Sequence, residues 1–307
     1  MSASITFSVI VVCKDAGEKL LATVKSAMSQ TYPHFEVLVK DGMSAEDPHI
    51  TLAEVLQDAA PYPALRILVS QDAGIYDAMN QAVAAASGDY LLFLNCGDSF
   101  ASPDVLAKTA AYLGEHPDVL LPYGHRINGM TGVLEYAPQA ITPFILFRGL
   151  PCHQACFYHK SLFAERGYDT KYRVRADYEH FFYCYYSGVE QAASAGSGDA
   201  GQNANSHAAG GSSGIRLMDF PVCVYEGGGF SETPANLKVS AKEHREICSR
   251  YFAPFQHFKY RLWLIVTLQP LRKKLADSKS FGALYQNLKQ SVSSGKTKSD
   301  IPNDERL

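Results

Sequence analysis

Short apolar runs alternate with helical patterns over the first 125 residues of the chain. Residues 5–12 are rich in β-branched side chains and apolar nearly throughout, as is typical of a strand buried on both faces of a parallel sheet. Similar runs predict strands at 35–40, 65–70, 90–94 and 119–123, and apolar residues at helical spacing predict helices near 20–28, 52–56, 75–86 and 105–113. This alternation predicts βαβ units and a doubly wound α/β sheet.

Polar side chains follow these strands at the points where the strands end. Asp15, Asp41, Asp72 and the pair Asn95 and Asp98 each come just after a predicted strand. Open parallel sheets bind their ligands beyond the carboxyl ends of the strands, so one cleft would collect all of these side chains. Each residue alone is more often a turn former or a helix cap, but four such positions in register favour a binding site.

The second half of the chain has a less regular pattern. Residues 128–147 have hairpin-like features, 153–158 are expected to be extended, and 161–163 open a short helix that stops at Gly167. The remaining expected elements are an aromatic helix after residue 180, a strand over 215–220 continued to 225, a glycine-rich loop over 226–231 and a helix over 238–251.

Two segments are expected to extend or interrupt the main domain. Residues 192–214 consist almost wholly of Ala, Gly, Ser, Asn and Asp, which predicts a flexible insertion. Residues 251–275 mix aromatic and aliphatic side chains with Lys and Arg, a pattern that suits a membrane surface or a helix packed on the domain or on a second subunit. The predicted organisation is a domain over 1–250, an amphipathic helical extension over 251–290 and a disordered tail over 291–307.

Composition narrows the class of protein. The chain of 307 residues is 47% hydrophobic and 19% charged with a formal net charge of −3, which argues against a nucleic-acid partner because no concentrated basic face is indicated. Seven cysteines without a CxxC pair, in a chain with no secretory signal, predict reduced thiols in a cytoplasmic protein. No run reaches the length of a membrane span, so any membrane contact is expected to be peripheral, at the inner face of the plasma membrane.

The sequence resembles the GT-A-fold glycosyltransferases of family 2, in particular the branch similar to colanic-acid-type exopolysaccharide transferases. The resemblance covers about the first 250 residues, and its carriers are SVIVVCKDAGEKL, SQTYPHFEVLVKDGMS, DAGIYDAMNQAVAAASGDYLLFLNCGD, HQACFYHKSLFAERGYD, RADYE and GGFS. It implies a GT-A doubly wound mixed sheet with helices on both faces. It also implies inverting transfer of a sugar from a UDP- or GDP-sugar to a saccharide acceptor, often lipid-linked, in cell-surface or exopolysaccharide synthesis.

The resemblance assigns roles to individual residues. Nucleotide-sugar binding is implied for Cys13, Asp15, Asp41, Gly42, Ser44, Asp72, Gly74, Asn80, Asn95, Asp98, His153 and Gln154. Asp41 would contact the base or ribose, and Asp98 would hold Mg²⁺ or Mn²⁺ against the diphosphate. The family's common motif has acidic residues where this chain has Asn95 and Gly97. Asp98 is therefore the only carboxylate of the motif in this chain, and the affinity for the cation in the absence of donor should be low.

Inverting transfer also needs a base that takes the proton of the acceptor hydroxyl on the face opposite the leaving diphosphate. The resemblance puts Asp177 in this role, with Glu179 as the nearest alternative. Asp is also a good N-cap, and a cap at the edge of a cleft would be a rigid mount for a base. The late GGFS loop would close over donor or acceptor, or form a plain glycine-rich turn.

Other classes fit the residues less well. A nicotinamide-binding Rossmann protein would need GxGxxG where this chain has CKDAGEKL, and a nucleotidyltransferase would need a glycine- and arginine-rich phosphate loop there. Zinc at Cys152, His153, Cys156 and His159 is disfavoured because an extended chain divides these side chains between two faces. A catalytically inactive nucleotide- or carbohydrate-binding module remains the alternative, since the acidic motif has only one carboxylate in this chain.

Overall fold

The computed structural model describes residues 4–58, 64–188, 214–229, 231 and 233–266. The chain divides into two compact units, Met1–Tyr251 and Phe252–Leu307. Residues 192–213 of the expected insertion and the expected tail over 291–307 lie outside the described residues.

A five-stranded mixed sheet forms the first part of the Met1–Tyr251 unit. Its strand order is β3–β2–β1–β4–β8, and β8 is antiparallel to β4 whereas the other neighbours are parallel. The register brings Cys13, Asp41 and Val69 level at the carboxyl edge, with Asn95 level with Val12. The strands are β1 (Phe7–Cys13), β2 (Phe35–Asp41), β3 (Ala64–Val69), β4 (Tyr90–Asn95) and β8 (Phe157–His159).

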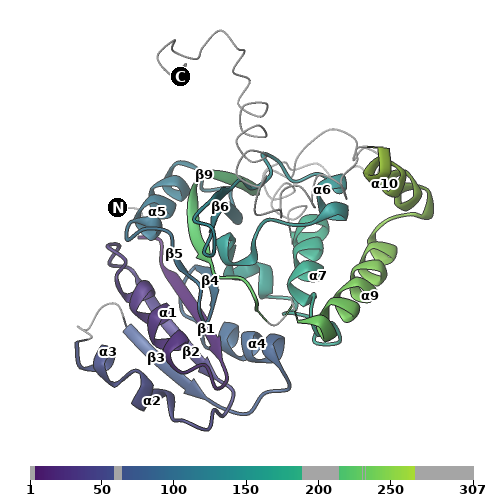
Figure 1. Cartoon of the computed structure of the whole chain (residues 1–307). Coiled ribbons are helices and arrows are strands. Elements are labelled where there is room, and N and C mark those ends of the chain that lie inside the picture. Colours follow the sequence, from purple (N-terminus) through teal and green to yellow (C-terminus); the bar gives the residue numbers. More distant parts are fainter. Residues whose placement is uncertain (1–3, 59–63, 189–213, 230, 232, 267–307) are drawn as a thin grey trace, which may run out of the picture. The chain divides into compact units, whose positions relative to one another are not determined.

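Helices cover both faces of this sheet (Figure 1). α1 (Glu18–Met28) buries Leu20 and Val24 in a cluster with alternate β1 residues such as Val9. α4 (Ile75–Ala85) contacts β1 and β2, and its buried side chains are not part of that cluster. Because side chains alternate across a strand, the apolar run of β1 supplies a core to each face, as expected from the sequence.

Between β2 and β3 the chain forms two short helices, of which the second contains most of the helix expected at 52–56. α2 (Pro48–Thr51) begins after Asp47, whose carboxylate accepts a hydrogen bond from the His49 N–H at 2.9 Å. Pro48 is favourable at the first helical position, which fixes this early start. α3 (Ala53–Asp58) follows directly.

A second, four-stranded sheet in the order β5–β9–β6–β7 extends the domain. It contains β5 (Ser99–Phe100), β6 (Leu121–Asn128), β7 (Leu134–Glu135) and β9 (Ile215–Tyr225), and α5 (Val105–Glu115) leads into β6. An isolated bridge between Tyr123 and Cys156 connects β6 to the segment before β8. The antiparallel pairing of β5 with β9, Ser99 opposite Val224, brings Asp98 close to the end of β9.

Three expectations for the middle of the chain are corrected. The hairpin-like region contains the short β6–β7 hairpin, but its end is α6 (Pro143–Arg148), with Thr142 capping the Ile145 N–H. The segment expected to be extended from 153 begins with the 3₁₀ turn η1 (His153–Ala155). The short helix expected at 161–163 is the 3₁₀ turn η2 (Lys160–Phe163).

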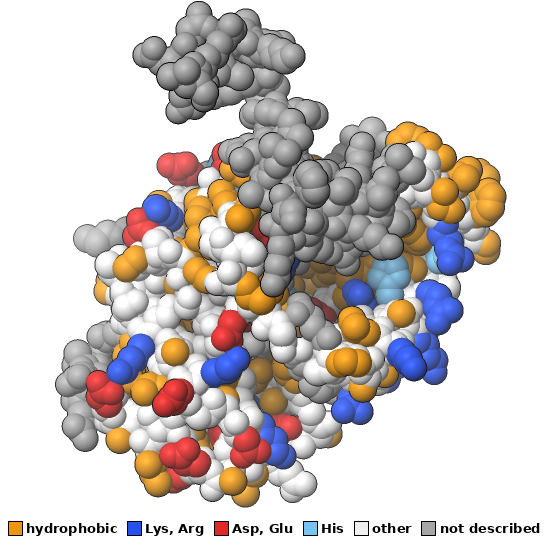
Figure 2. Space-filling model, viewed as in Figure 1, with side chains coloured by type: hydrophobic (Ala, Val, Ile, Leu, Met, Phe, Trp, Pro, Cys, Tyr) orange, Lys and Arg blue, Asp and Glu red, His pale blue; other side chains and the backbone are white. Residues whose placement is uncertain are grey.

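The aromatic helix is α7 (Ala176–Tyr183), which continues as the π-helical turn η3 (Cys184–Gly188). Its N-cap is Arg175, so Asp177 lies in the first turn and is not the cap that the sequence allowed. α9 (Pro234–Tyr251) ends the first unit. On the face shown in Figure 2, acidic and basic side chains are interspersed where Figure 1 has α1, α2 and α3.

The described part of the second unit contains α10 (Pro254–Val266). Hydrophobic side chains gather over this helix in Figure 2. The large hydrophobic side chains of α10 that are exposed are Phe255, Phe258, Leu262, Trp263, Ile265 and Val266. Among the described residues, no helix is both long and apolar enough to cross a membrane.

Candidate active site

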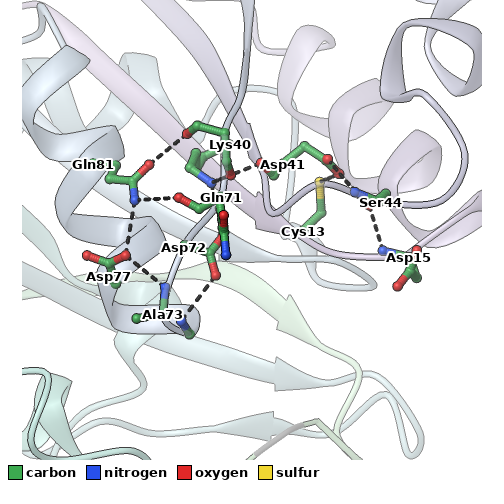
Figure 3. A network of polar contacts seen from close by, with 12 residues as sticks. Cys13, Asp15, Lys40, Asp41, Ser44, Gln71, Asp72, Ala73, Asp77 and Gln81 are labelled. Atoms are coloured by element: carbon green, nitrogen blue, oxygen red, sulfur yellow. Dashed lines mark hydrogen bonds and ion pairs between the residues drawn. The ribbon is translucent and has the colours of Figure 1, made fainter.

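A buried carboxylate, Asp41, organises the end of β2. Its oxygens accept hydrogen bonds from the Ser44 N–H at 2.8 Å, from the Ser44 hydroxyl and from the Cys13 thiol at 3.4 Å. The Asp15 N–H donates to Ser44 Oγ at 2.7 Å, and Asp15 Oδ1 accepts from the Ala45 N–H at 2.8 Å. Figure 3 shows the four predicted residues of this corner in one network. Asp41 is only 1% exposed, so in this structure it shapes the loop after β2.

The loops at this corner have unusual backbone conformations. Asp15 and Met43 have φ angles of 52° and 62°, a region that few non-glycine residues adopt. A Cβ atom on Gly42 would lie 2.6 Å from Asp72 Oδ2, so only glycine lets the ends of β2 and β3 approach this closely. Strained loops at a strand edge are typical of ligand sites.

Lys40 is a fully buried cation that joins the ends of β2 and β3. Its Nζ donates to Asp72 Oδ2 at 3.0 Å and to the carbonyl oxygens of Asp41 and Ser70 at 2.9 and 2.8 Å (Figure 3). Asp72 Oδ1 also accepts from the Gly74 N–H at 3.1 Å. All three donors of Lys40 are thereby used, and the loop that opens α4 is fixed to the sheet.

The first turn of α4 is further held by its own side chains. Asp77 accepts from the Ala73 N–H at 2.9 Å and from Gln81 Nε2 at 3.0 Å, and Gln81 also donates to the Gln71 carbonyl at 3.1 Å (Figure 3). A cavity of about 340 Å³ opens beside this turn and is lined by Ala73, Gly74, Ile75, Tyr76, Asp77, Thr170, Tyr172 and Arg173. Space for a ligand therefore lies next to Gly74.

Asn80 was expected to bind the nucleotide sugar, but its amide has structural partners in this structure. Asn80 Nδ2 donates to the Tyr168 carbonyl at 2.9 Å, and Asn80 Oδ1 accepts from the Tyr168 N–H at 2.8 Å. A Cβ atom on Gly167 would lie 2.3 Å from Asn80 Oδ1, which explains the glycine. Asn80 thus fastens the segment before α7 to α4.

The acidic corner is built around Asp98, which is 4% exposed. Asp98 Oδ2 accepts from Gln154 Nε2 and Asp98 Oδ1 from the Glu226 N–H, both at 2.9 Å. Burial raises the pKa of Asp98 to about 6, although these hydrogen bonds oppose the shift. η1 and the end of β9, far apart in sequence, therefore meet at the one carboxylate of the predicted motif.

Four further residues lie around Asp98. Gly97 has a φ of 105°, and Glu226 carries a carboxylate that lies over it. Lys19 Nζ forms an ion pair with Glu226 Oε2 at 2.9 Å, and both side chains are about half exposed. Asn95 Oδ1 is buried and has no hydrogen-bond partner among the described residues.

Asp177, the predicted base, lies beside a buried tyrosine of α4. The Tyr76 hydroxyl is 2.7 Å from Asp177 Oδ1 and 2.8 Å from the Val174 carbonyl oxygen. Burial, reinforced by the charge of Asp177, raises the pKa of Tyr76, so Tyr76 remains a hydroxyl donor. His153 Nε2 is 2.9 Å from the Tyr168 hydroxyl, and burial lowers the pKa of His153 while the nearby Asp177 opposes that shift. A neutral imidazole therefore lies near Asp177.

Two other carboxylates hold α7 in place. Glu243 of α9 accepts from the N–H groups of Arg173, Val174 and Arg175 at 2.8, 3.0 and 2.9 Å. Glu179 is 0% exposed, and Arg166 donates to both of its oxygens at 3.0 and 2.9 Å. Glu179 also accepts from Tyr251, so its contacts favour Asp177 over Glu179 as the residue that faces substrate.

The sequence pattern disfavoured zinc at Cys152, His153, Cys156 and His159. The described residues contain no group of three or more His, Cys, Asp or Glu side chains that could hold a metal ion. The segment is not extended from residue 153 as expected, because η1 is a 3₁₀ turn. Cys156, directly after this turn, donates its thiol to the Cys152 carbonyl at 3.2 Å, and His153 Nε2 lies 2.9 Å from the Tyr168 hydroxyl.

Four residues at the site were not predicted from the sequence: Lys40, Tyr76, Glu226 and Glu243. A lysine at the end of a largely apolar strand, directly before Asp41, was a signal for Lys40. Glu226 directly before three glycines was a weaker one, because its partners Lys19 and Asp98 are 207 and 128 residues away.

The arrangement of sheets and strand-end residues defines a GT-A fold, and solved structures share it. The chain is similar to residues 1–349 of S. aureus TarS, with a TM-score of 0.55 and 17% identity over 82% of this chain and 68% of that one. It is also similar to the mannosyltransferase PcManGT from Pyrobaculum calidifontis in complex with GDP-Man and Mn²⁺. The TM-score is 0.57, with 16% identity over 97% of this chain and 82% of that one. At these identities the similarity shows the fold alone.

The family follows from the sequence. The model of glycosyl transferase family 2 matches residues 8–191, more than half of the chain, and the chain therefore belongs to this family. A PGL/p-HBAD biosynthesis glycosyltransferase of Mycobacterium tuberculosis is 35% identical over 182 residues, 58% of this chain and 69% of that protein. The amylovoran biosynthesis glycosyltransferase AmsB of Erwinia amylovora is 32% identical over 99 residues, 31% of this chain and 32% of AmsB.

Proposed function

We propose that this glycosyltransferase moves a sugar, with inversion, from a UDP- or GDP-sugar to a saccharide acceptor, free or lipid-linked, in the synthesis of a cell-surface or exopolysaccharide. The relatives named for PGL/p-HBAD and amylovoran biosynthesis support this substrate class. The donor class is supported by the solved structures of S. aureus TarS 1–349 in complex with UDP and of PcManGT in complex with GDP-Man.

One observation carries the proposal: η1 connects the acidic corner to the predicted base. Gln154 donates to Asp98, and the adjacent His153 is connected to Asp177 through the neighbouring rings of Tyr168 and Tyr76. A donor whose diphosphate lies at Asp98 would therefore present its sugar towards His153 and Asp177. This is the arrangement that transfer between the diphosphate and an incoming hydroxyl requires.

The nucleoside would bind at the corner formed by Asp15, Asp41 and Ser44. The strained loop after β2 exposes Met43, which is 58% exposed and can pack on a base. Asp72 and Gly74, fixed by Lys40, would border the ribose and phosphates. The cavity beside Gly74 provides room on that side.

The donor set at the acidic corner suits Mg²⁺ or Mn²⁺. It offers hard oxygen ligands, namely the carboxylates of Asp98 and Glu226 and the buried Asn95 Oδ1, which lacks a partner among the described residues. When bound, the cation would neutralise the diphosphate as it leaves. Asp98 would be the residue that holds it, as expected from the family motif.

Asp177 would act as the base. The acceptor hydroxyl would lose its proton to an Asp177 oxygen while its own oxygen forms a bond to the anomeric carbon. The bond from that carbon to the diphosphate oxygen breaks, and the electron pair leaves with the diphosphate. Attack opposite the leaving group inverts the anomeric configuration.

Binding of the donor is the first test. Thermal-shift and calorimetric titrations with UDP, GDP and their sugars, with and without Mn²⁺, should show Mn²⁺-dependent binding of one nucleotide. Asp177→Asn should retain this binding but lose turnover by about 10²- to 10⁴-fold. Absence of binding across the whole panel, or near-normal turnover of folded Asp177→Asn, would refute the proposal.

An inactive nucleotide- or carbohydrate-binding module is the second candidate. The observation in its favour is that Asp98 is buried with both oxygens hydrogen-bonded. Slow hydrolysis of the donor sugar in the presence of Mn²⁺ distinguishes the two candidates. If the protein is an enzyme, the wild type should catalyse this hydrolysis and the Asp98→Asn variant should not. Binding of a UDP- or GDP-sugar without any Asp98-dependent hydrolysis would favour the module.

We also propose that α10 contacts an anionic membrane surface. Phe255, Phe258 and Leu262 recur at helical spacing and are 76%, 65% and 50% exposed, and Lys259 and Arg261 flank this apolar stripe. A helix of this kind binds lipid through apolar burial and cationic attraction together. Co-sedimentation with phosphatidylglycerol vesicles should fall on Phe258→Ser, and equal binding to neutral phosphatidylcholine vesicles would contradict the electrostatic part.

A further inference from the structure

The glycine in the thinned acidic motif has a structural cause. A Cβ atom built on Gly97 would lie 2.0 Å from Glu226 Oε2 and 3.1 Å from the Glu226 carboxyl carbon. These distances mean that the carboxylate of Glu226 already occupies the space that a side chain at position 97 would fill. The acidic group missing from the motif in the sequence is thus replaced in space by one from the end of β9.

Glu226 is held in this place from both ends. Its backbone N–H donates to Asp98 Oδ1 at 2.9 Å, which fixes the residue to the acidic corner. Its side chain is 47% exposed, whereas Asp98 is 4% exposed. Glu226 is therefore the carboxylate of this corner that a cation arriving from solvent with a diphosphate can reach directly.

Lys19 is the present partner of this carboxylate. Its Nζ lies 2.9 Å from Glu226 Oε2, and it extends from the first turn of α1, 207 residues away in the sequence. An exposed pair of this kind contributes little to stability, so its partners can exchange at low cost. Lys19 thus neutralises Glu226 where a divalent cation would otherwise do so.

We propose that Glu226 is the second carboxylate ligand of the divalent cation, in place of a side chain at position 97, and that Lys19 competes with the cation for it. The proposal rests on the proposed function, because the cation is expected to bind together with a nucleoside diphosphate. Two carboxylates together with diphosphate oxygens form a common Mg²⁺ or Mn²⁺ ligand set. On leaving Glu226, Lys19 would be free to pair with the diphosphate.

The two partners of the ion pair should have opposite effects on cation binding. We would titrate Mn²⁺ in the presence of UDP or GDP and follow the free ion by electron paramagnetic resonance. Glu226→Gln should weaken Mn²⁺ binding by at least about tenfold, as expected for loss of a ligand or of its close support. Lys19→Met should leave Mn²⁺ binding as tight as in the wild type or tighter, because it removes the competitor.

Lys25 and Glu54 provide a matched control. They form another exposed lysine–glutamate pair with the same separation of 2.9 Å, and Lys25 is also on α1. Lys25→Met and Glu54→Gln should both leave Mn²⁺ binding unchanged. If Glu226 merely forms a surface ion pair, Glu226→Gln and Lys19→Met should behave alike, and that result would overturn the proposal.

The space at position 97 gives a second variant. Gly97→Ala should displace the Glu226 carboxylate and also strain the loop, because φ at this position is 105°. It should therefore weaken Mn²⁺ binding at least as much as Glu226→Gln, with folding checked by circular dichroism. Wild-type affinity in folded Glu226→Gln would refute the role of Glu226 even if UDP or GDP binds with Mn²⁺ as proposed. Failure of the wild type to bind Mn²⁺ with either nucleotide would instead refute the proposed function and, with it, this inference.

Discussion

Asp98→Asn should stabilise the ligand-free protein at neutral pH while it abolishes cation-dependent donor binding. The substitution keeps the shape of the side chain and removes its charge. Asp98 is almost fully buried, and its carboxylate oxygens accept from an amide side chain and a backbone N–H, both of them neutral groups. A carboxylate in this position is retained at a cost in folding free energy, which is expected where a residue serves binding.

The magnitude follows from the pKa of Asp98, which burial raises from 3.8 to about 6. Each step of one in pKa corresponds to 1.36 kcal/mol, so the charged form costs on the order of 3 kcal/mol relative to an unperturbed carboxyl. Because the folded-state pKa is the higher one, the folded protein binds the proton more tightly than the unfolded chain. The contribution of Asp98 to stability is therefore most favourable below about pH 4 and is lost as the pH rises through 6.

The assay is thermal or urea unfolding of both proteins between pH 4 and pH 8 without ligands. The amide introduced by Asp98→Asn can accept from the Glu226 N–H, but Gln154 must turn its own amide to pair with the new Nδ2, which costs about 1 kcal/mol. The variant should match or fall slightly below the wild type near pH 4 and exceed it by about 2 kcal/mol at pH 7 to 8. Asp118→Asn, on an exposed side chain, should change stability by less than about 0.5 kcal/mol. A variant that is less stable than the wild type at pH 8, or a difference independent of pH, would refute the reasoning.

Two further substitutions test the support of the site. Lys40→Met should lower stability by about 3 to 5 kcal/mol in urea unfolding, because it leaves the carboxylate of Asp72, which is only 11% exposed, without a cation. Lys25→Met, at an exposed lysine, should cost less than about 1 kcal/mol, and equal effects of the two substitutions would contradict this account. Tyr76→Phe removes the hydroxyl beside Asp177, so the base loses its orienting partner. The substitution should lower kcat by roughly tenfold to a hundredfold and leave donor affinity, measured by calorimetry, unchanged. An equal loss of donor affinity would indicate that Tyr76 contacts the donor instead.

The first half of the fold could be predicted because each of its elements has a strong local pattern. The run at β1 is apolar on both faces, and the structure buries every residue of Phe7–Cys13. The strand–helix–strand connections imply parallel strands, whose carboxyl ends lie at one edge, so placing Asp41 and Asn95 near that edge required no tertiary detail. The expected boundaries differ from the observed ones mainly where caps such as Asp47 and Thr142 set the start of a helix.

The surroundings of the site could not be predicted in the same way. Glu226 reaches position 97 only because β9 pairs with β5 and β6, and no local pattern encodes these pairings. The same holds for Tyr76 and Asp177, which are 101 residues apart and meet because Asn80 fastens α4 to the segment before α7. Pattern analysis identified the carboxylates but not their partners. The sequence therefore indicated an acidic corner with one carboxylate, where the structure has two.

The most direct test of the central claim is the anomeric configuration of the first product. We would incubate the wild type with Mn²⁺ and the α-linked UDP- or GDP-sugar that binds, and follow the released or transferred sugar by ¹H NMR before mutarotation. The account predicts a β-configured product, lost in Asp98→Asn and in Asp177→Asn. An α-configured first product, or the same rate in Asp177→Asn as in the wild type, would contradict it.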